Sequence, residues 1–339
     1  MSRYHRTLFT AALITTVVAG TAGWASADTQ LAVTGPPPGS AAWLADDSLG
    51  RELPDPSAST PDQVAHFFGT LTGRQQQQLA HRHPLVVGNL DGAPVSLRYE
   101  ANHLALQQAG KEYEDLAAPG HQILAFDPRG RGQVAEVYGD LAATEHVSVV
   151  VPGSDTDAGH FAATATMAKN LRAATDDRTA VIAWAGYTTP VGIGLDAATS
   201  DLAEAGAPRL TRLTEGLEAT GAAEPVLFCH SYGSVVCGLA ARDTPYAADL
   251  VVTGSPGMHA DTAADLHTDA RVWAAKDPGD WIDDVPNVRF AGLGHGEDPT
   301  DPSFGARIVP ARDAKGHTGY YTPGTESLRT FASIALGEI

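Results

Sequence analysis

One serine stands in a setting that could make it a nucleophile. Ser231 lies in the segment His-Ser-Tyr-Gly-Ser, directly after an apolar run over 225–229 and before a run of small residues over 235–241. A strand, a tight turn and a helix in this order are typical of a nucleophile elbow, which exposes the serine hydroxyl. The usual pattern is Gly-x-Ser-x-Gly, and here Cys229 replaces the first glycine. An ordinary turn serine is the alternative interpretation of Ser231.

A serine hydroxyl becomes a strong nucleophile when a histidine accepts its proton and a carboxylate orients that histidine. In sheets of this kind the chain order is serine, acid, histidine. Asp280 and Asp277 both follow a predicted strand, and we favour Asp280 because the chain turns back toward the body there. His317 follows the last predicted strand and is the expected base, while His295 precedes that strand and is the alternative.

The transition state of acyl transfer also needs donors for a developing oxyanion. The backbone N–H of Tyr232, next to the serine, is one predicted donor. The second is the N–H of Ser154, which follows an apolar strand and a Pro-Gly turn, with Gly153 allowing a close approach. A plain turn at the strand end is the alternative for Gly153 and Ser154.

Other chemistries have weaker support. The glycines at 192 and 194 do not directly follow a strand, and no suitable acid follows them, so no dinucleotide site is predicted. No histidine pair has the spacing of a zinc-binding helix, and we expect no metal and no cofactor. The chain has 22 Lys and Arg against 40 Asp and Glu, a formal charge of −18. Such a chain repels phosphate backbones, so we expect no nucleic-acid partner.

The elements that would position these residues follow an α/β pattern. Short apolar runs predict strands at 122–126, 134–138, 147–151, 180–184, 225–229, 250–253, 271–275 and 306–309. Longer Ala-rich stretches predict helices at about 158–175, 196–219, 232–242 and 324–337. Strands that alternate with helices indicate a mostly parallel central sheet covered by helices on both faces. The first two strands are expected to form an antiparallel hairpin.

The amino-terminal third has a different organisation. Basic residues, an apolar stretch over 8–24 and Ala-Ser-Ala predict a signal peptide at 1–27, cleaved after Ala27. The Pro-rich stretch over 28–60 is interpreted as a flexible linker or arm. A capping box at Thr60 predicts a helix from Pro61, and a second short helix is expected from Gly73, opening a domain over 61–339.

The two cysteines lie on either side of the serine turn. An oxidising compartment would permit a disulfide between Cys229 and Cys237, which are eight residues apart. We expect two buried free thiols, with the disulfide as the alternative.

Taken together, the ordered motifs resemble an actinobacterial alpha/beta-hydrolase family of unknown substrate. The resemblance covers about 61–337 and rests on these segments: Val87 to Pro94, Val151 to Ser154, His230 to Ser234, Gly254 to Met258, Pro278 to Asp280, Gly294 to Gly296 and Gly316 to Tyr321. It implies an alpha/beta-hydrolase fold and a serine-hydrolase activity, with Ser231, Asp280 and His317 in the catalytic positions. It implies no particular substrate.

We therefore predict a secreted or cell-envelope serine hydrolase that cleaves an ester or similar acyl bond. The expected partner is a small-molecule or lipid-like acyl substrate, and no membrane span is expected after signal cleavage. A non-catalytic binding or cell-envelope protein on the same fold is the alternative from another class. A peptidase or amidase is the alternative within the enzymes.

Overall fold

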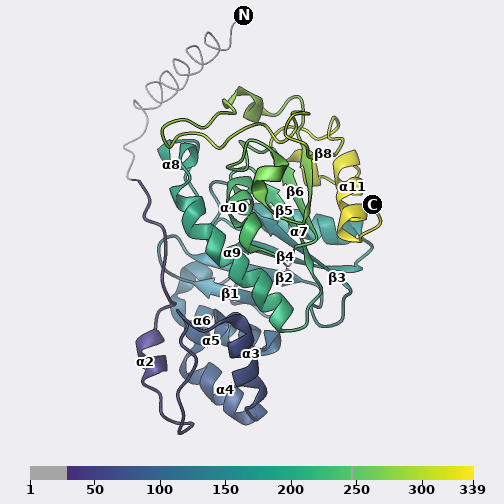
Figure 1. Cartoon of the computed structure of the whole chain (residues 1–339). Helices are drawn as coiled ribbons and strands as arrows, with labels where there is room; N and C mark the ends of the chain where they lie inside the picture. Colours follow the sequence, from purple (N-terminus) through teal and green to yellow (C-terminus); the bar gives the residue numbers. More distant parts are fainter. Residues whose placement is uncertain (1–28, 246) are drawn as a thin grey trace, which may run out of the picture.

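The computed structural model describes residues 29–245 and 247–339, and the predicted signal peptide lies outside them. Its centre is an eight-stranded sheet with the order β1-β2-β4-β3-β5-β6-β7-β8 (Figure 1). The strands are β1 (Ile123–Asp127), β2 (Gln133–Tyr138), β3 (His146–Val151), β4 (Thr179–Ala185), β5 (Pro225–His230), β6 (Asp249–Thr253), β7 (Arg271–Ala275) and β8 (Arg307–Ile308). Each predicted strand is present within a few residues of its expected position.

The sheet is parallel except at one edge. β2 pairs antiparallel with both β1 and β4, so the predicted opening hairpin is confirmed. From β4 through β3 and β5 to β8 every pairing is parallel. The carboxyl ends of these strands therefore meet at one edge of the sheet, where the loops that carry the candidate residues begin.

Helices cover both faces of the sheet, as predicted. They are α7 (Ala162–Ala174), α8 (Leu195–Ala198), α9 (Asp201–Ala219), α10 (Gly233–Ala240) and α11 (Glu326–Ala335). Along β5, Leu227 and Cys229 share one core with α9 and α10, and Phe228 belongs to the opposite core with α7 and α11. This alternation explains why the strands are nearly continuous apolar runs, since both of their faces are buried.

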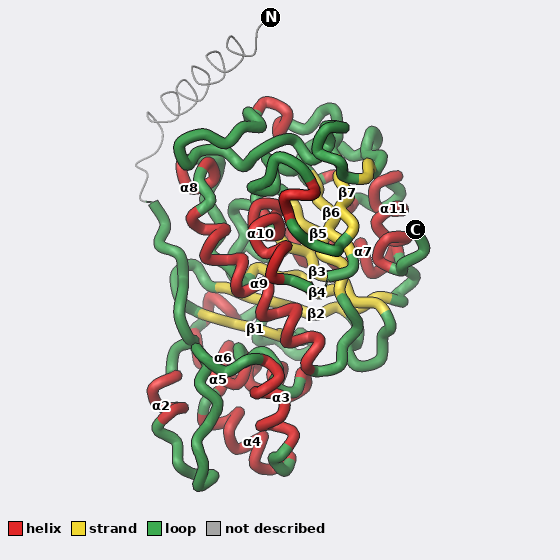
Figure 2. The backbone as a smooth tube through the Cα atoms, viewed as in Figure 1, coloured by secondary structure: helices red, strands yellow, loops and turns green. Residues whose placement is uncertain are grey.

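A smaller cluster of helices lies beyond the β1 edge of the sheet (Figure 2). It comprises α2 (Ser40–Leu44), α3 (Pro61–Gly69), α4 (Gly73–Arg82), α5 (Pro84–Gly88) and α6 (Val95–Ala109). The Thr60 side chain accepts a hydrogen bond from the Gln63 N–H, and the Gln63 side chain accepts one from the Thr60 N–H, so the predicted capping box is present. The helical amino-terminal segment has a hydrophobic core of its own, which includes Trp43 and Phe68.

Helix α6 was not predicted, although it has 15 residues. Its buried face carries Arg98 and Asn102 among apolar residues, which removes the hydrophobic period that identifies a surface helix. Asn102 Nδ2 donates to the carbonyls of Gly88 and Ile123, each at 3.0 Å. These polar side chains join the helix to α5 and to the start of β1, a tertiary role that their spacing does not reveal.

The segment over 29–60 differs from the expected flexible arm. Trp43 is fully buried, and its indole N–H donates to the Pro54 carbonyl at 2.7 Å. Further upstream, Gln30 donates from its backbone N–H to Asp196 at 3.0 Å, and the Val33 N–H donates to Thr188 at the same distance. The prolines remove periodicity, but contacts with the body fix the segment in place. Within residues 29–245 and 247–339, no helix combines the length and the apolar character required to cross a bilayer.

Candidate active site

Ser231 occupies the turn between β5 and α10 in a backbone conformation that is rare for residues with a side chain. Its φ is +54°, in the left-handed region, and its N–H donates to the Thr253 carbonyl at 2.9 Å. Such a conformation costs energy and persists only where the surroundings enforce it. The side chain is largely enclosed, with 8% of the residue exposed. This is the sharp strand-to-helix turn that the motif predicts.

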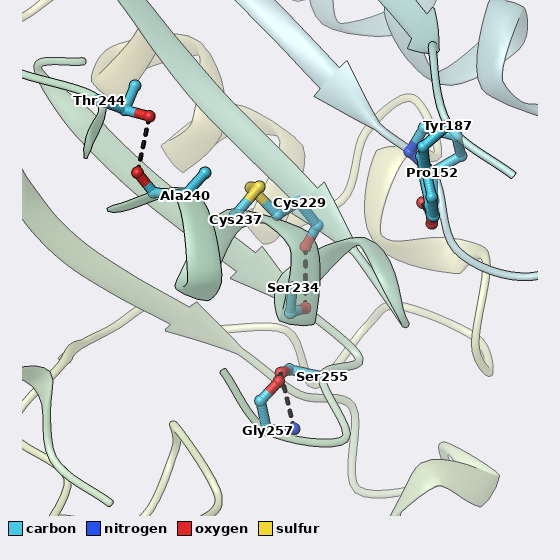
Figure 3. The surroundings of a disulfide bond; sticks show 9 residues. All are labelled: Pro152, Tyr187, Cys229, Ser234, Cys237, Ala240, Thr244, Ser255 and Gly257. Carbon is cyan, nitrogen blue, oxygen red and sulfur yellow. Dashed lines mark hydrogen bonds between the residues drawn. A yellow bond between two sulfur atoms is a disulfide. The ribbon is translucent and has the colours of Figure 1, made fainter. Parts of the chain in front are cut away.

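The two cysteines form a disulfide across this turn, and the prediction of free thiols was wrong. Cys229 is the penultimate residue of β5 and Cys237 lies in α10, with their Cα atoms 6.5 Å apart (Figure 3). The reversal at Ser231 brings the helix back onto the strand, so residues far apart along an extended chain come within bridging range. Cys229, which replaces the first glycine of the Gly-x-Ser-x-Gly pattern, is therefore one of the two bridged cysteines.

His317 and Asp280 come together from separate loops after the strands. His317 Nδ1 lies 2.9 Å from Asp280 Oδ1 and 3.0 Å from Oδ2. Asp280 also accepts hydrogen bonds from the Tyr320 hydroxyl at 2.5 Å and the Ile282 N–H at 3.0 Å. Burial raises the pKa of Asp280, but these hydrogen bonds outweigh it and hold the pKa below its usual value. An ionised carboxylate is thus positioned to orient the imidazole.

Asp277, the competing acid, has a different place. Its Oδ2 accepts from the Gly316 N–H at 2.9 Å, which fixes the loop just before His317. The Tyr320 hydroxyl accepts from the Asp277 N–H at 3.1 Å and donates to Asp280. Asp277 therefore supports the loop, and the geometry brings Asp280 to the histidine.

Ser231 and His317 border the same small region of the structure. Gly254 follows the Thr253 carbonyl that holds Ser231, and a Cβ at Gly254 would lie 2.9 Å from Asp280 Oδ2 and 3.1 Å from His317 Cε1. Trp281 packs on His317 with ring centroids 4.5 Å apart, and it lines the same cavity as Ser231. Across the described residues no hydrogen bond joins Ser231 Oγ to His317, a contact that commonly tightens only when substrate binds.

His230, the residue before the serine, adds a buried imidazole to this region. Its Nε2 lies 2.7 Å from the His317 carbonyl oxygen, and its ring centroid is 4.8 Å from that of His317. Burial lowers the pKa of His230 to about 4, and the neighbouring His317 acts in the same direction. Neutral His230 can therefore donate from Nε2 to the carbonyl and hold His317 in place.

This burial predicts a loss of stability in mild acid. Unfolded His230 takes up a proton near pH 6.5, whereas folded His230 does so only near pH 4. The contribution of neutral His230 to the free energy of unfolding is therefore complete above about pH 6.5. As the pH falls toward 4, about 3 kcal/mol of it is lost.

Urea unfolding at pH 7 and pH 4.5 would measure this loss of stability. His230→Gln should lose less stability between these pH values than wild type, while His66→Gln, at an exposed position, should match wild type. An equal loss in His230→Gln and wild type would contradict the assignment.

The strand end at β3 approaches the serine closely. A Cβ at Gly153 would lie 2.5 Å from Ser231 Cβ, 2.9 Å from Ser231 Oγ and 3.0 Å from the Tyr232 nitrogen. Such distances leave space for glycine only. In the described ranges, the N–H groups of Ser154 and Tyr232 donate to no turn, loop or side-chain acceptor. Both residues line the cavity beside Ser231, so their N–H groups are candidate donors to an oxyanion.

The cavity beside Ser231 has a volume of about 460 Å³. Its walls come from the segment that contains α8, through Ile193 and Ala197, and from the segment over 281–294, through Trp281 and Val288. Sequence reasoning did not identify the segment over 281–294 as a wall of this cavity. The exposed apolar residues in it, Trp281 and Phe290, are the signal that could have indicated it.

A second serine and histidine lie nearby. Ser200 Oγ is 3.0 Å from His259 Nδ1 and 3.4 Å from His295 Nδ1. His295 Nε2 bonds the Ala197 carbonyl at 2.8 Å, and its ring packs edge-on against Tyr232. The second ring nitrogen of His295 thus contacts a neutral carbonyl oxygen. The corresponding partner of His317 is the carboxylate of Asp280. His295 supports the loops around Tyr232.

Within the described ranges, no cluster of three or more His, Cys, Asp or Glu side chains could hold a metal ion.

A family model described as alpha/beta hydrolase matches residues 127–290, which include Ser231 and Asp280. The matched residues belong to that family. The resemblance seen in the sequence and the predicted fold class are thereby confirmed, and the sheet order and the covering helices agree with both.

The curated relatives of this alpha/beta hydrolase are mycobacterial. The chain is 28% identical over 374 residues to the uncharacterized protein Rv2079 of Mycobacterium tuberculosis, with 84% of this chain and 57% of the relative covered. It is 32% identical over 173 residues to the uncharacterized protein Rv0963c of the same species, covering 45% and 64%. The chain thus spans little more than half the length of the first relative.

Solved structures that resemble the chain include hydrolases. The esterase domain of a Rhodothermus marinus protein matches with a TM-score of 0.37 and 13% identity, covering 62% of this chain and 92% of that chain. The 2,6-dihydroxy-pseudo-oxynicotine hydrolase matches with a TM-score of 0.39 and 14% identity, covering 86% and 93%.

Proposed function

We propose that this protein is a secreted serine hydrolase that cleaves an ester or similar acyl bond. The observation that carries the proposal is the convergence at one sheet edge of a strained, cavity-lining Ser231 and a histidine held by a buried carboxylate. Ser231 would be the nucleophile, His317 the base that accepts its proton, and Asp280 the carboxylate that orients His317.

The reaction follows from these positions. Ser231 Oγ attacks the acyl carbon while its proton passes to His317 Nε2, and Asp280 stabilises the imidazolium through Nδ1. The N–H groups of Tyr232 and Ser154 bind the oxyanion of the tetrahedral intermediate. Collapse expels the alcohol, which takes the proton from His317 and leaves an acyl group on Ser231. Water, deprotonated by His317, then attacks that acyl carbon, and the acid leaves as Ser231 regains its proton.

The walls of the cavity favour an apolar acyl group. Ile193, Val285, Val288 and Leu293 line it, and the exposed side chains of Leu195 and Phe290 extend the apolar surface in the same two segments. Burying an acyl chain there would gain about 0.8 kcal/mol for each methylene removed from water. A lipid-like ester is therefore the proposed substrate class.

Covalent labelling tests the proposal directly. A fluorophosphonate phosphonylates an activated serine, so intact mass should show one adduct on the wild-type protein and none on Ser231→Ala. Ser200→Ala is the matched control, because it removes the other serine close to a histidine, and it should label like wild type. Labelling that persists in Ser231→Ala, or that disappears in Ser200→Ala, would place the nucleophile elsewhere. A folded wild-type protein that does not label would favour a binding role.

A further inference from the structure

A second cavity, of about 390 Å³, lies at the β1 edge of the sheet. The amino-terminal segment, which descends past α8 and β1 toward α2 in Figures 1 and 2, forms one wall through Thr34 to Pro37. Strands β1 and β2, helices α6 and α9, and the loops that contain Pro56 and Asn89 contribute to the others. This cavity shares no lining residue with the cavity beside Ser231, and the proposed reaction does not use it.

Four arginines line this cavity: Arg98, Arg129, Arg209 and Arg212. Two of them are neutralised by carboxylates that also line it, since Arg98 pairs with Asp91 at 2.9 Å and Arg129 pairs with Asp127 at 2.6 Å. The four charges on these pairs therefore cancel, and the cavity keeps the charge of the remaining two arginines.

Arg209 and Arg212 have no carboxylate partner among the described ion pairs. They stand three residues apart on α9, so they lie on the same side of the helix. Arg209 donates from Nε to the Gly186 carbonyl at 2.6 Å, and Arg212 donates from one Nη to the Ser59 carbonyl at 3.1 Å. Each guanidinium has five N–H donors, so most of them remain free for an acceptor in the cavity. Burial lowers the pKa of Arg209, which is the cost of removing this cation from water, and the charges of Asp127 and Asp91 act in the opposite direction.

Gln133 provides an independent observation. It lines the same cavity, only 3% of it is exposed, and neither its Nε2 nor its Oε1 has a hydrogen-bond partner among residues 29–245 and 247–339. A buried amide without partners costs free energy unless something else pairs with it. An apolar residue of similar size would fill this position in β2 at less cost if the amide had no ligand.

We propose that this cavity binds a small organic anion, a carboxylate or a phosphate ester. Its oxyanion meets the guanidinium groups of Arg209 and Arg212, and a neighbouring polar group of the ligand pairs with the Gln133 amide. Guanidinium groups suit both kinds of oxyanion because their forked donors match the oxygen spacing. The site belongs to the amino-terminal helices as much as to the sheet, which gives that segment a role in ligand binding.

Isothermal titration calorimetry on the purified full chain would test this site with two probes, inorganic phosphate and succinate. We expect one equivalent of at least one probe to bind, and the preferred probe distinguishes a phosphate ester from a carboxylate. Arg212→Gln should weaken binding by about tenfold or more, since it removes a charged donor. Arg242→Gln is the control, because it removes an exposed arginine outside the cavity, and it should bind like wild type.

Gln133→Met separates binding from folding. The Gln133 side chain makes no hydrogen bond with the described residues, so the variant should unfold in urea at the same concentration as wild type or a higher one. It should nevertheless bind the probe more weakly, by about tenfold. The proposal is overturned if neither probe binds the wild-type protein, or if Arg212→Gln and Gln133→Met both bind as tightly as Arg242→Gln. These outcomes are independent of serine labelling, so the site can fail while the hydrolase proposal stands.

Discussion

Replacement of His317 by alanine is expected to lower kcat/KM for p-nitrophenyl octanoate by at least about a thousandfold. Without the imidazole, the Ser231 hydroxyl keeps its proton at neutral pH, and no base activates the water that hydrolyses the acyl-enzyme. The oxyanion donors and the cavity would remain, so substrate should still bind and a small residual rate should persist. Steady-state hydrolysis by the folded variant would measure the loss, which should fall mainly on kcat.

Two comparisons make this result specific. His295→Ala removes the buried histidine that packs against Tyr232 and should keep more of the activity than His317→Ala. Residues that act as one unit give losses that do not add, so the Ser231→Ala and His317→Ala double variant should be no slower than Ser231→Ala alone. If His317→Ala kept most of its activity while His295→Ala lost it, the catalytic base would be His295, which lies beside Ser200, and not His317.

The second large effect concerns a residue with no reactive group. Gly153→Ala should lower kcat by about a hundredfold, because the new Cβ would lie 2.5 Å from Ser231 Cβ and 3.0 Å from the Tyr232 nitrogen. Both are fixed parts of the turn, so the loop must move away by about 1 Å, a displacement that can cost this much. The donor expected at Ser154 would move with it. Hydrolysis rates and circular dichroism of the same preparation would show whether activity falls in a folded protein.

Gly194→Ala is a suitable control for this substitution. Gly194 precedes α8 in a loop near the cavity, has a negative φ of −77°, and a Cβ there would meet nothing within 4 Å. The variant should therefore retain wild-type turnover. If Gly153→Ala were equally active, the strand end at β3 would not contribute to the oxyanion site.

The sequence predicted those parts of the molecule whose pattern is local. The strands of the sheet are continuous apolar runs because both faces are buried, and the turn at Ser231 has a distinctive set of small residues. The candidate residues could also be expected to lie close together, because they follow different strands and the carboxyl ends of parallel strands meet at one edge of the sheet. Asp280 was favoured over Asp277 because the chain turns back toward the body there, but the separate contacts of the two carboxylates, with His317 and with the Gly316 N–H, could not be predicted from one shared loop.

Long-range contacts account for what the sequence did not predict. Helix α6 buries Arg98 and Asn102, whose partners lie in α5 and at the start of β1, so its pattern contains no hydrophobic stripe. The segment over 29–60 is fixed by Trp43 and by hydrogen bonds to residues more than 150 positions away. The pairing of Cys229 with Cys237 depended on how sharply the chain reverses at Ser231, which no spacing rule states.

The bridge between Cys229 and Cys237 persists when the chain unfolds. It closes a loop of eight residues around Ser231 and removes many of the conformations that this segment could otherwise adopt in the unfolded state. Loop entropy of this size favours the folded protein by about 2 to 3 kcal/mol without adding a contact to it. The hydrogen bond and packing that hold Ser231 are present in the folded state in any case. Reduction would therefore lower the stability of the serine turn while leaving its native geometry available.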